Sequence, residues 1–175
     1  MTRRLLPRAR AVRLAIFDVD GVLTDGVLYL SERGEAFKAF HILDGQGLKM
    51  LRASGVELAL LSGRKSAAVL KRATEVGVDH VVQGAQDKLR AFRMLLRKAG
   101  LTETEAAFMG DDLPDLPVLR CCGFAISVPG APALVQRHAH YVTRRPGGFG
   151  AVREACELLM QAQGTLSRQL EAYLR

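Results

Sequence analysis

One short segment constrains this chain more than any other, an apolar run at residues 15–17 that ends in two aspartates separated by one residue. Side chains alternate faces along a strand, so Asp18 and Asp20 are expected to point the same way. Open α/β sheets bind their ligands at the carboxyl ends of the strands, where this pair would lie. Two carboxylates so close together repel each other, and a bound cation or different protonation roles would explain the pair. Solvated aspartates that simply end a strand are the alternative for the pair taken alone.

The rest of the chain alternates apolar runs with helical patterns, which predicts an α/β fold with a Rossmann-like, mainly parallel sheet flanked by helices. Strands are expected near residues 14–19, 57–61, 79–82, 105–109 and 124–126. Helices are expected near residues 45–54, 65–76, 87–99, 113–121, 131–138 and 151–162. Between the first two strands, the runs 27–30 and 36–40 flank a polar turn at 31–35 and predict a β-hairpin flap that projects over the site.

Three more polar groups stand at the ends of predicted elements. Ser62 and Asp111 follow apolar runs, and Lys88 begins a helical pattern, so a parallel sheet would bring all three to the same edge. A carboxylate nucleophile, an acidic metal site, a hydroxyl and an amine are the parts needed to transfer a phosphoryl group. The intervals between the motifs are too short for a cap domain beyond the hairpin.

The ordered set resembles the four motifs of the haloacid dehalogenase superfamily of phosphotransferases over roughly residues 12–160. The motifs are DVDGVLT at 18–24, Ser62, Lys88 and GDDLPD at 110–115. Further segments narrow the resemblance to the 3-deoxy-D-manno-octulosonate 8-phosphate phosphatase family: FHILDGQG at 40–47, SGR at 62–64, QGAQDK at 83–88 and RPGGFGAVRE at 145–154. Relatives that act on nine-carbon sugar acid phosphates are expected to carry an acidic residue where this chain has Arg64.

The resemblance implies a magnesium-dependent phosphatase acting before sugar activation for lipopolysaccharide. Asp18 would be the nucleophile that forms an aspartyl-phosphate, and Asp20 the general acid and then base. Ser62 and Lys88 would contact the transferring phosphoryl group. Capping of a helix by Ser62 and a solvated Lys88 are the alternatives.

An all-oxygen site with few protein ligands suits Mg²⁺, a hard cation that keeps bound waters. Its expected ligands are Asp18, the Asp20 carbonyl and Asp111, with Asp112 and Asp115 as supports behind them. For the sugar acid, cations are needed away from the metal, and arginine recognises carboxylates bidentately. The expected substrate-binding residues, five of them placed in the flap turn, are Asp20, His41, Ile42, Leu43, Asp44, Gly45, Lys49, Arg64, Arg72 and Lys88. A solvated Arg72 and a packing role for His41 are alternatives.

Length and composition fit one compact enzyme domain. The chain has 175 residues, 49% of them hydrophobic. The expected organisation is a basic N-terminal extension at 1–11, a phosphatase domain at 12–163 and a polar, poorly ordered C-terminal tail at 164–175. The site is expected to be largely uncapped, and the resemblance implies a homotetramer with shared active sites.

Other function classes are less favoured. The net charge of +7 comes largely from arginines before the first motif, and aromatic residues are not interleaved with basic ones, so nucleic acid is not the expected partner. Apolar runs are too short for a membrane span, and the N-terminus lacks the apolar region of a secretory signal. Three cysteines without metal or disulfide spacing indicate reduced core thiols, hence the cytoplasm. A phosphatase for another monoester and a non-catalytic oligomerisation module of this fold remain the rival functions.

Overall fold

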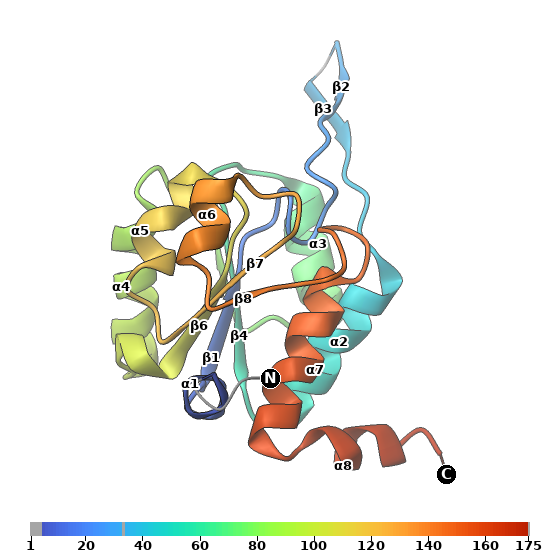
Figure 1. Ribbon diagram of the computed structural model, residues 1–175. Helices are drawn as coiled ribbons and strands as arrows, with labels where there is room; N and C mark the ends of the chain where they lie inside the picture. Colours follow the sequence, from blue (N-terminus) through green and yellow to red (C-terminus); the bar gives the residue numbers. More distant parts are fainter. Residues whose placement is uncertain (1–4, 33, 175) are drawn as a thin grey trace.

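The computed structural model describes residues 5–32 and 34–174 and has a single six-stranded parallel sheet at its centre (Figure 1). The strand order is β5-β4-β1-β6-β7-β8, so β1 lies inside the sheet between β4 and β6. The strands are β1 (Leu14–Phe17), β4 (Glu57–Leu61), β5 (His80–Val82), β6 (Ala106–Met109), β7 (Phe124–Ser127) and β8 (Tyr141–Val142).

Helices cover both faces of this sheet. In Figure 1, α2 and α7 lie side by side on one face, and α4, α5 and α6 cover the other. The helices are α1 (Leu6–Arg10), α2 (Ile42–Ala53), α3 (Ala67–Val76), α4 (Lys88–Ala99), α5 (Leu116–Leu119), α6 (Ala133–His138), α7 (Ala151–Gln163) and α8 (Leu166–Glu171), with 3₁₀ turns η1 (Glu103–Glu105) and η2 (Leu113–Asp115). The predicted Rossmann-like fold is confirmed.

The central strands owe their positions to continuous apolar sequence. All four residues of β1, β6 and β7 are buried, as expected for strands covered on both faces by helices. Phe17, Phe108 and Phe124 at three neighbouring strands and Phe92 on α4 are among the largest fully buried side chains. This rigid core fixes the carboxyl ends of β1, β4 and β6, where the predicted site residues begin.

The predicted hairpin is present and projects from the carboxyl edge of the sheet (Figure 1). Its antiparallel strands, β2 (Tyr29–Ser31) and β3 (Gly34–Phe37), lie nearer the turn than expected. Tyr29 and Phe37 stack with ring centroids 4.5 Å apart. The second strand stops at Phe37, and the next residue, Lys38, pairs with Asp20 in the body of the protein.

Several predicted boundaries of helices and strands were wrong, and some short elements were not predicted. β8 was missed because a two-residue strand leaves no periodic pattern. Helix α2 begins at Ile42 and not near residue 45, because the His41 side chain caps it; residues 41–45 therefore lie at a helix start and not in the flap turn. Part of the tail that was expected to be poorly ordered is the helix α8, and part of the expected N-terminal extension is α1, which packs against α7.

In the described part of the chain, no helix has the length and apolar character needed to cross a bilayer.

Candidate active site

Four of the predicted site residues converge at one edge of the sheet. Asp18 follows β1, Ser62 follows β4, Asp111 lies just past β6, and Lys88 opens α4. The parallel register pairs Phe17 with Leu60 and Met109, which brings the residues that follow these three strands to the same level of the sheet. A cleft of about 360 Å³ lies between them, lined by Asp18, Asp20, Gly26, Ser62, Gly63, Arg64, Ala85, Gln86, Lys88, Asp111, Asp112 and Pro114.

Asp18 is buried and held by two hydrogen bonds. Its Oδ1 accepts from the backbone N–H of Val19 at 2.7 Å, and its Oδ2 accepts from Lys88 Nζ at 2.8 Å. Burial and the charge of Asp115 raise the pKa of Asp18 to about 7, although Lys88 acts in the opposite direction. The carboxylate is therefore fixed in orientation but short of positive charge.

Asp115 connects Lys88 to the acidic loop after β6. Its Oδ1 lies 2.6 Å from Lys88 Nζ, and its Oδ2 accepts hydrogen bonds from the backbone N–H groups of Asp111 and Asp112 at 3.0 and 3.1 Å. Burial opposes the charge of Lys88, but the carboxylates of Asp18 and Asp115 raise its pKa, so it remains an ammonium. Asp115 thereby positions both the amine and the loop that carries Asp111.

The acidic cluster fits a divalent cation. Ligand atoms of Asp18, Asp111 and Asp115 all lie within 4.8 Å of one another. Asp111 Oδ1 is buried and has no hydrogen-bond partner among residues 5–32 and 34–174, and burial together with the charge of Asp18 raises the pKa of Asp111 to about 7. Three carboxylates face one ammonium, that of Lys88, and an all-oxygen donor set of this kind suits Mg²⁺. The position after Asp20 favours glycine, because its φ is 84° and a Cβ there would lie 2.0 Å from Asp111 Oδ2 and displace that carboxylate.

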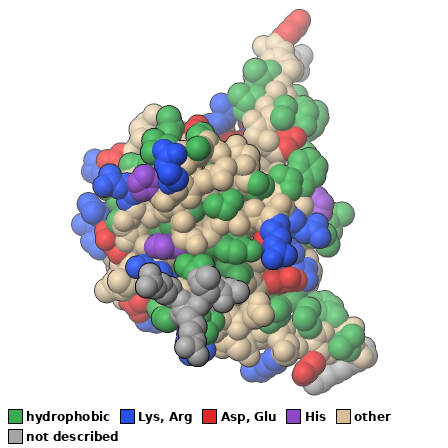
Figure 2. Space-filling view, in the orientation of Figure 1, with side chains coloured by type: hydrophobic (Ala, Val, Ile, Leu, Met, Phe, Trp, Pro, Cys, Tyr) green, Lys and Arg blue, Asp and Glu red, His purple; other side chains and the backbone are tan. Residues whose placement is uncertain are grey.

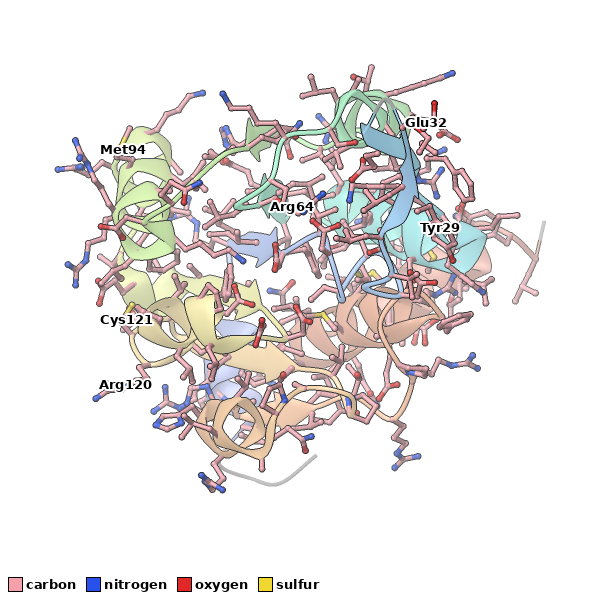
Figure 3. The ribbon with its side chains drawn as sticks, turned by 90° about the horizontal axis from the view of Figure 1, so that it is seen from above. Tyr29, Glu32, Arg64, Met94, Arg120 and Cys121 are labelled. Carbon is pink, nitrogen blue, oxygen red and sulfur yellow. The ribbon has the colours of Figure 1, made fainter. Side chains whose placement is uncertain are left out.

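Two residues of the hairpin that the sequence reasoning missed reach the same site. Lys38 donates a hydrogen bond to Asp20 Oδ1, and its Nζ lies 2.9 Å from Glu35 Oε2. Glu35 also lies 3.5 Å from Arg64 Nη2, and Arg64 lies near the middle of the molecule as seen from above (Figure 3). The available signal was the pair of opposite charges at the foot of a hairpin expected to cover the site.

Ser62 and Asp112 occupy local structural positions within the cleft. Ser62 is buried, and its Oγ accepts a hydrogen bond from the backbone N–H of Arg64 at 3.1 Å, which leaves the hydroxyl hydrogen to donate. Asp112 is exposed and caps η2 through a 2.7 Å bond from the N–H of Leu113. Asp112 therefore shapes the acidic loop.

The remaining predicted sugar-binding residues do not line this cleft. Most of them lie at the start of α2, and Lys49 lies further along the same helix. Arg72 donates to the His41 carbonyl at 3.3 Å and pairs with Glu75, and the buried Asp44 accepts from the N–H groups of Gly150 and Arg153. Those outside the cleft are His41, Ile42, Leu43, Asp44, Gly45, Lys49 and Arg72. Of the predicted substrate contacts, the cleft contains Asp20, Arg64 and Lys88.

Known proteins resemble this chain over nearly its whole length, although comparison with protein-family models gave no match. The 3-deoxy-D-manno-octulosonate 8-phosphate phosphatase of Escherichia coli K12 is 44% identical over 162 residues, which are 93% of this chain and 86% of that protein. A phosphatase of the same name from Salmonella typhi is 42% identical over 166 residues, covering 95% and 88%.

Solved structures agree with the sequence matches. A probable YrbI family phosphatase from Pseudomonas syringae superposes with a TM-score of 0.97 at 50% identity, covering 99% of both chains. The 3-deoxy-D-manno-octulosonate 8-phosphate phosphatase from Moraxella catarrhalis, solved with magnesium, phosphate and a KDO molecule, gives a TM-score of 0.96 at 40% identity and covers 99% of both chains.

Proposed function

The chain belongs to the 3-deoxy-D-manno-octulosonate 8-phosphate phosphatase family of the haloacid dehalogenase superfamily, and from this premise we propose that it hydrolyses that sugar phosphate to the free sugar acid and phosphate. The observation that carries the proposal is the convergence of Asp18, Lys88 and Asp111 in one cleft with Asp20 beside them. The pathway served would be lipopolysaccharide biosynthesis.

The reaction needs two phosphoryl transfers. In the first, an oxygen of Asp18 attacks phosphorus, the bond from phosphorus to the sugar oxygen breaks, and Asp20 gives that oxygen a proton. In the second, water attacks the aspartyl-phosphate, Asp20 takes a proton from the water, and Asp18 is released. Lys88, held by Asp18 and Asp115, balances charge on the transferring group, and Ser62 donates a hydrogen bond to it.

Magnesium is the cofactor of the proposed reaction, since a relative was solved with this ion and the acidic cluster fits it. Asp18, Asp111 and the Asp20 carbonyl would hold the ion, which supplies Lewis-acid stabilisation of the phosphoryl oxygens. Asp115 is better suited to support the ligands, because it is fully buried behind the cleft and its Oδ2 holds the backbone N–H groups of Asp111 and Asp112.

We propose that sugar recognition is shared between copies of the chain in a homotetramer. The cleft contains Arg64 but not the cluster at the start of α2, whose members Ile42 and Leu43 are exposed to solvent. Apolar side chains on the hairpin are exposed as well, and Figure 2 shows them gathered there. A neighbour's hairpin and α2 cluster would complete and cover the cleft. For the compartment we propose the cytoplasm, which the three free cysteines support.

The test is phosphate release with Mg²⁺ from a panel of esters: 3-deoxy-D-manno-octulosonate 8-phosphate, a nine-carbon sugar acid 9-phosphate and simple hexose phosphates. We expect selective release from the octulosonate ester and its loss in Asp18→Asn, which keeps the shape of the site but removes the nucleophilic charge. Preference for the nine-carbon ester, or equal rates on all esters, would reject the proposed substrate. Failure to hydrolyse any ester would favour a non-catalytic oligomerisation module.

A further inference from the structure

The foot of the hairpin places a nearly buried lysine on Asp20. Lys38 donates a hydrogen bond to Asp20 Oδ1, and its side chain is only 4% exposed. Burying an ammonium is costly unless it is paired, and Lys38 is paired twice, since Glu35 Oε2 lies 2.9 Å from its Nζ. A flexible side chain is thereby held in one place beside the proposed acid.

Glu35 anchors this lysine to the body of the protein. Its Oε1 accepts a 2.8 Å hydrogen bond from Ser66 Oγ, and its Oε2 lies 3.5 Å from Arg64 Nη2. Ser66 precedes the first turn of α3, so the hairpin is tied to the loop that carries Ser62. The position of Lys38 therefore depends on contacts from both the hairpin and the sheet edge.

The two oxygens of Asp20 differ in their surroundings. Oδ1 accepts the hydrogen bond from Lys38, whereas Oδ2 has Arg64 Nε at 4.0 Å and accepts no hydrogen bond from a side chain or backbone group within residues 5–32 and 34–174. A carboxyl group with one oxygen fixed by a donor has a defined orientation and carries its proton on the other oxygen.

We infer that Lys38 is a positioning residue for Asp20, and that Oδ2 is the oxygen that exchanges the proton; this inference rests on the proposed function. In the first transfer, Oδ2 gives its proton to the leaving sugar oxygen as the ester bond to phosphorus breaks. In the second, Oδ2 takes a proton from the water that attacks the aspartyl-phosphate. Lys38 touches neither the phosphate nor the sugar in this scheme.

The inference is tested with Lys38→Met on two esters that differ in leaving group. General acid catalysis contributes about 10²–10⁴-fold, so kcat for a sugar phosphate should fall about tenfold or more while KM changes about twofold at most. For 4-nitrophenyl phosphate, kcat/KM should stay within about twofold, because a phenolate leaves without a proton and kcat/KM reports the first transfer. Lys38→Arg should restore part of the loss, and Lys71→Met, an exposed lysine on α3, serves as the control.

A double-mutant cycle with Asp20→Asn decides whether Lys38 acts through Asp20. If it does, Lys38→Met adds no further loss in the Asp20→Asn background. Equal losses on both esters, or losses that multiply in the double variant, would overturn the inference and leave Lys38 a structural residue. If the methionine variant does not fold, the same two esters are measured with Lys38→Gln, which removes the ammonium charge while its amide keeps a polar neighbour for Glu35.

The proposed function fails separately from this inference. If the wild-type protein hydrolyses a different alkyl phosphate in place of the octulosonate ester, the substrate assignment is rejected, while the comparison of alkyl and aryl esters still tests Lys38. Failure of the wild-type protein to hydrolyse any ester would reject both.

Discussion

At the scale of single residues, the negative charges at the carboxyl end of β1 outnumber the positive ones. In the described part of the chain, the carboxylates of Asp18, Asp111 and Asp115 face one ammonium, that of Lys88, and Asp111 Oδ1 is buried without a hydrogen-bond partner. Buried carboxylates without compensating charge take up protons more readily. In the metal-free protein, protons and Mg²⁺ therefore compete for the same oxygens.

This competition predicts that Mg²⁺ raises the melting temperature more at pH 8 than at pH 6. The pKa values of Asp18 and Asp111 are raised from 3.8 to about 7, so the folded metal-free protein holds protons that the unfolded chain has released between those values. Stability of the metal-free protein falls as pH rises through this window. Below about pH 7, Mg²⁺ must displace protons, and each one lowers its apparent affinity by up to about tenfold per pH unit.

Thermal unfolding with and without Mg²⁺ at pH 6, 7 and 8 measures the effect, because groups remote from the site cancel in the difference at each pH. Asp111→Asn is the control and should reduce both the shift and its pH dependence. Equal Mg²⁺-induced shifts at pH 6 and pH 8 would mean that the two carboxylates are already ionised in the metal-free protein.

At the scale of secondary-structure elements, the strands buried on both faces could be predicted from sequence. β4, β6 and β7 were predicted to within one residue, because a strand covered by helices is a continuous apolar run. Asp18, Ser62 and Asp111 could be placed for the same reason, since each follows such a run. Because these strands are parallel neighbours, the three residues lie at the same end of the sheet.

What the sequence could not predict depends on contacts between distant segments. The start of α2 is set by the His41 side chain, which caps the helix. The role of Asp44 is set by hydrogen bonds from the backbone N–H groups of Gly150 and Arg153, more than 100 residues away. The opposite charges of Glu35 and Lys38 are visible in the sequence, but only the path of the hairpin brings Lys38 to Asp20. β8 is too short to show a period.

The turn after β1 gives a prediction for Gly21. Gly21 and Gly55 both have positive φ angles, 84° and 102°, but only at Gly21 would a Cβ strike a neighbour, Asp111 Oδ2 at 2.0 Å. Gly55→Ala should cost about 1–2 kcal/mol of unfolding free energy from backbone strain alone. Gly21→Ala should cost more and abolish the Mg²⁺-induced rise in melting temperature, because Asp111 must move. Denaturant unfolding and thermal shifts measure both; a Gly21→Ala protein that responds normally to Mg²⁺ would contradict this account of the turn.

At the scale of the whole molecule, the residues expected to recognise the substrate form two groups. Arg64 lines the cleft, whereas the α2 cluster, with Arg72 against the His41 carbonyl, is built around the junction of α2, α3 and α7. The hairpin stands away from the body with Val27, Leu28, Leu30 and Phe37 exposed (Figures 1 and 2). An apolar projection and an open cleft on one chain are complementary features if several copies assemble.

The assembly is tested with a charge on the hairpin. Leu30 is 66% exposed and should be buried between copies in the proposed homotetramer, so Leu30→Asp should lower the mass measured by sedimentation. The fold of each chain should persist, since the core does not include the hairpin. Activity on the sugar acid phosphate should fall with the mass, because a neighbour would no longer cover the cleft.

Met94→Asp is the matched control: Met94 is 54% exposed on α4, on the opposite side from Tyr29 and Glu32 of the hairpin (Figure 3). A wild-type protein that sediments as a monomer would reject the shared site, and full activity in a dissociated Leu30→Asp protein would show that each cleft is complete on its own.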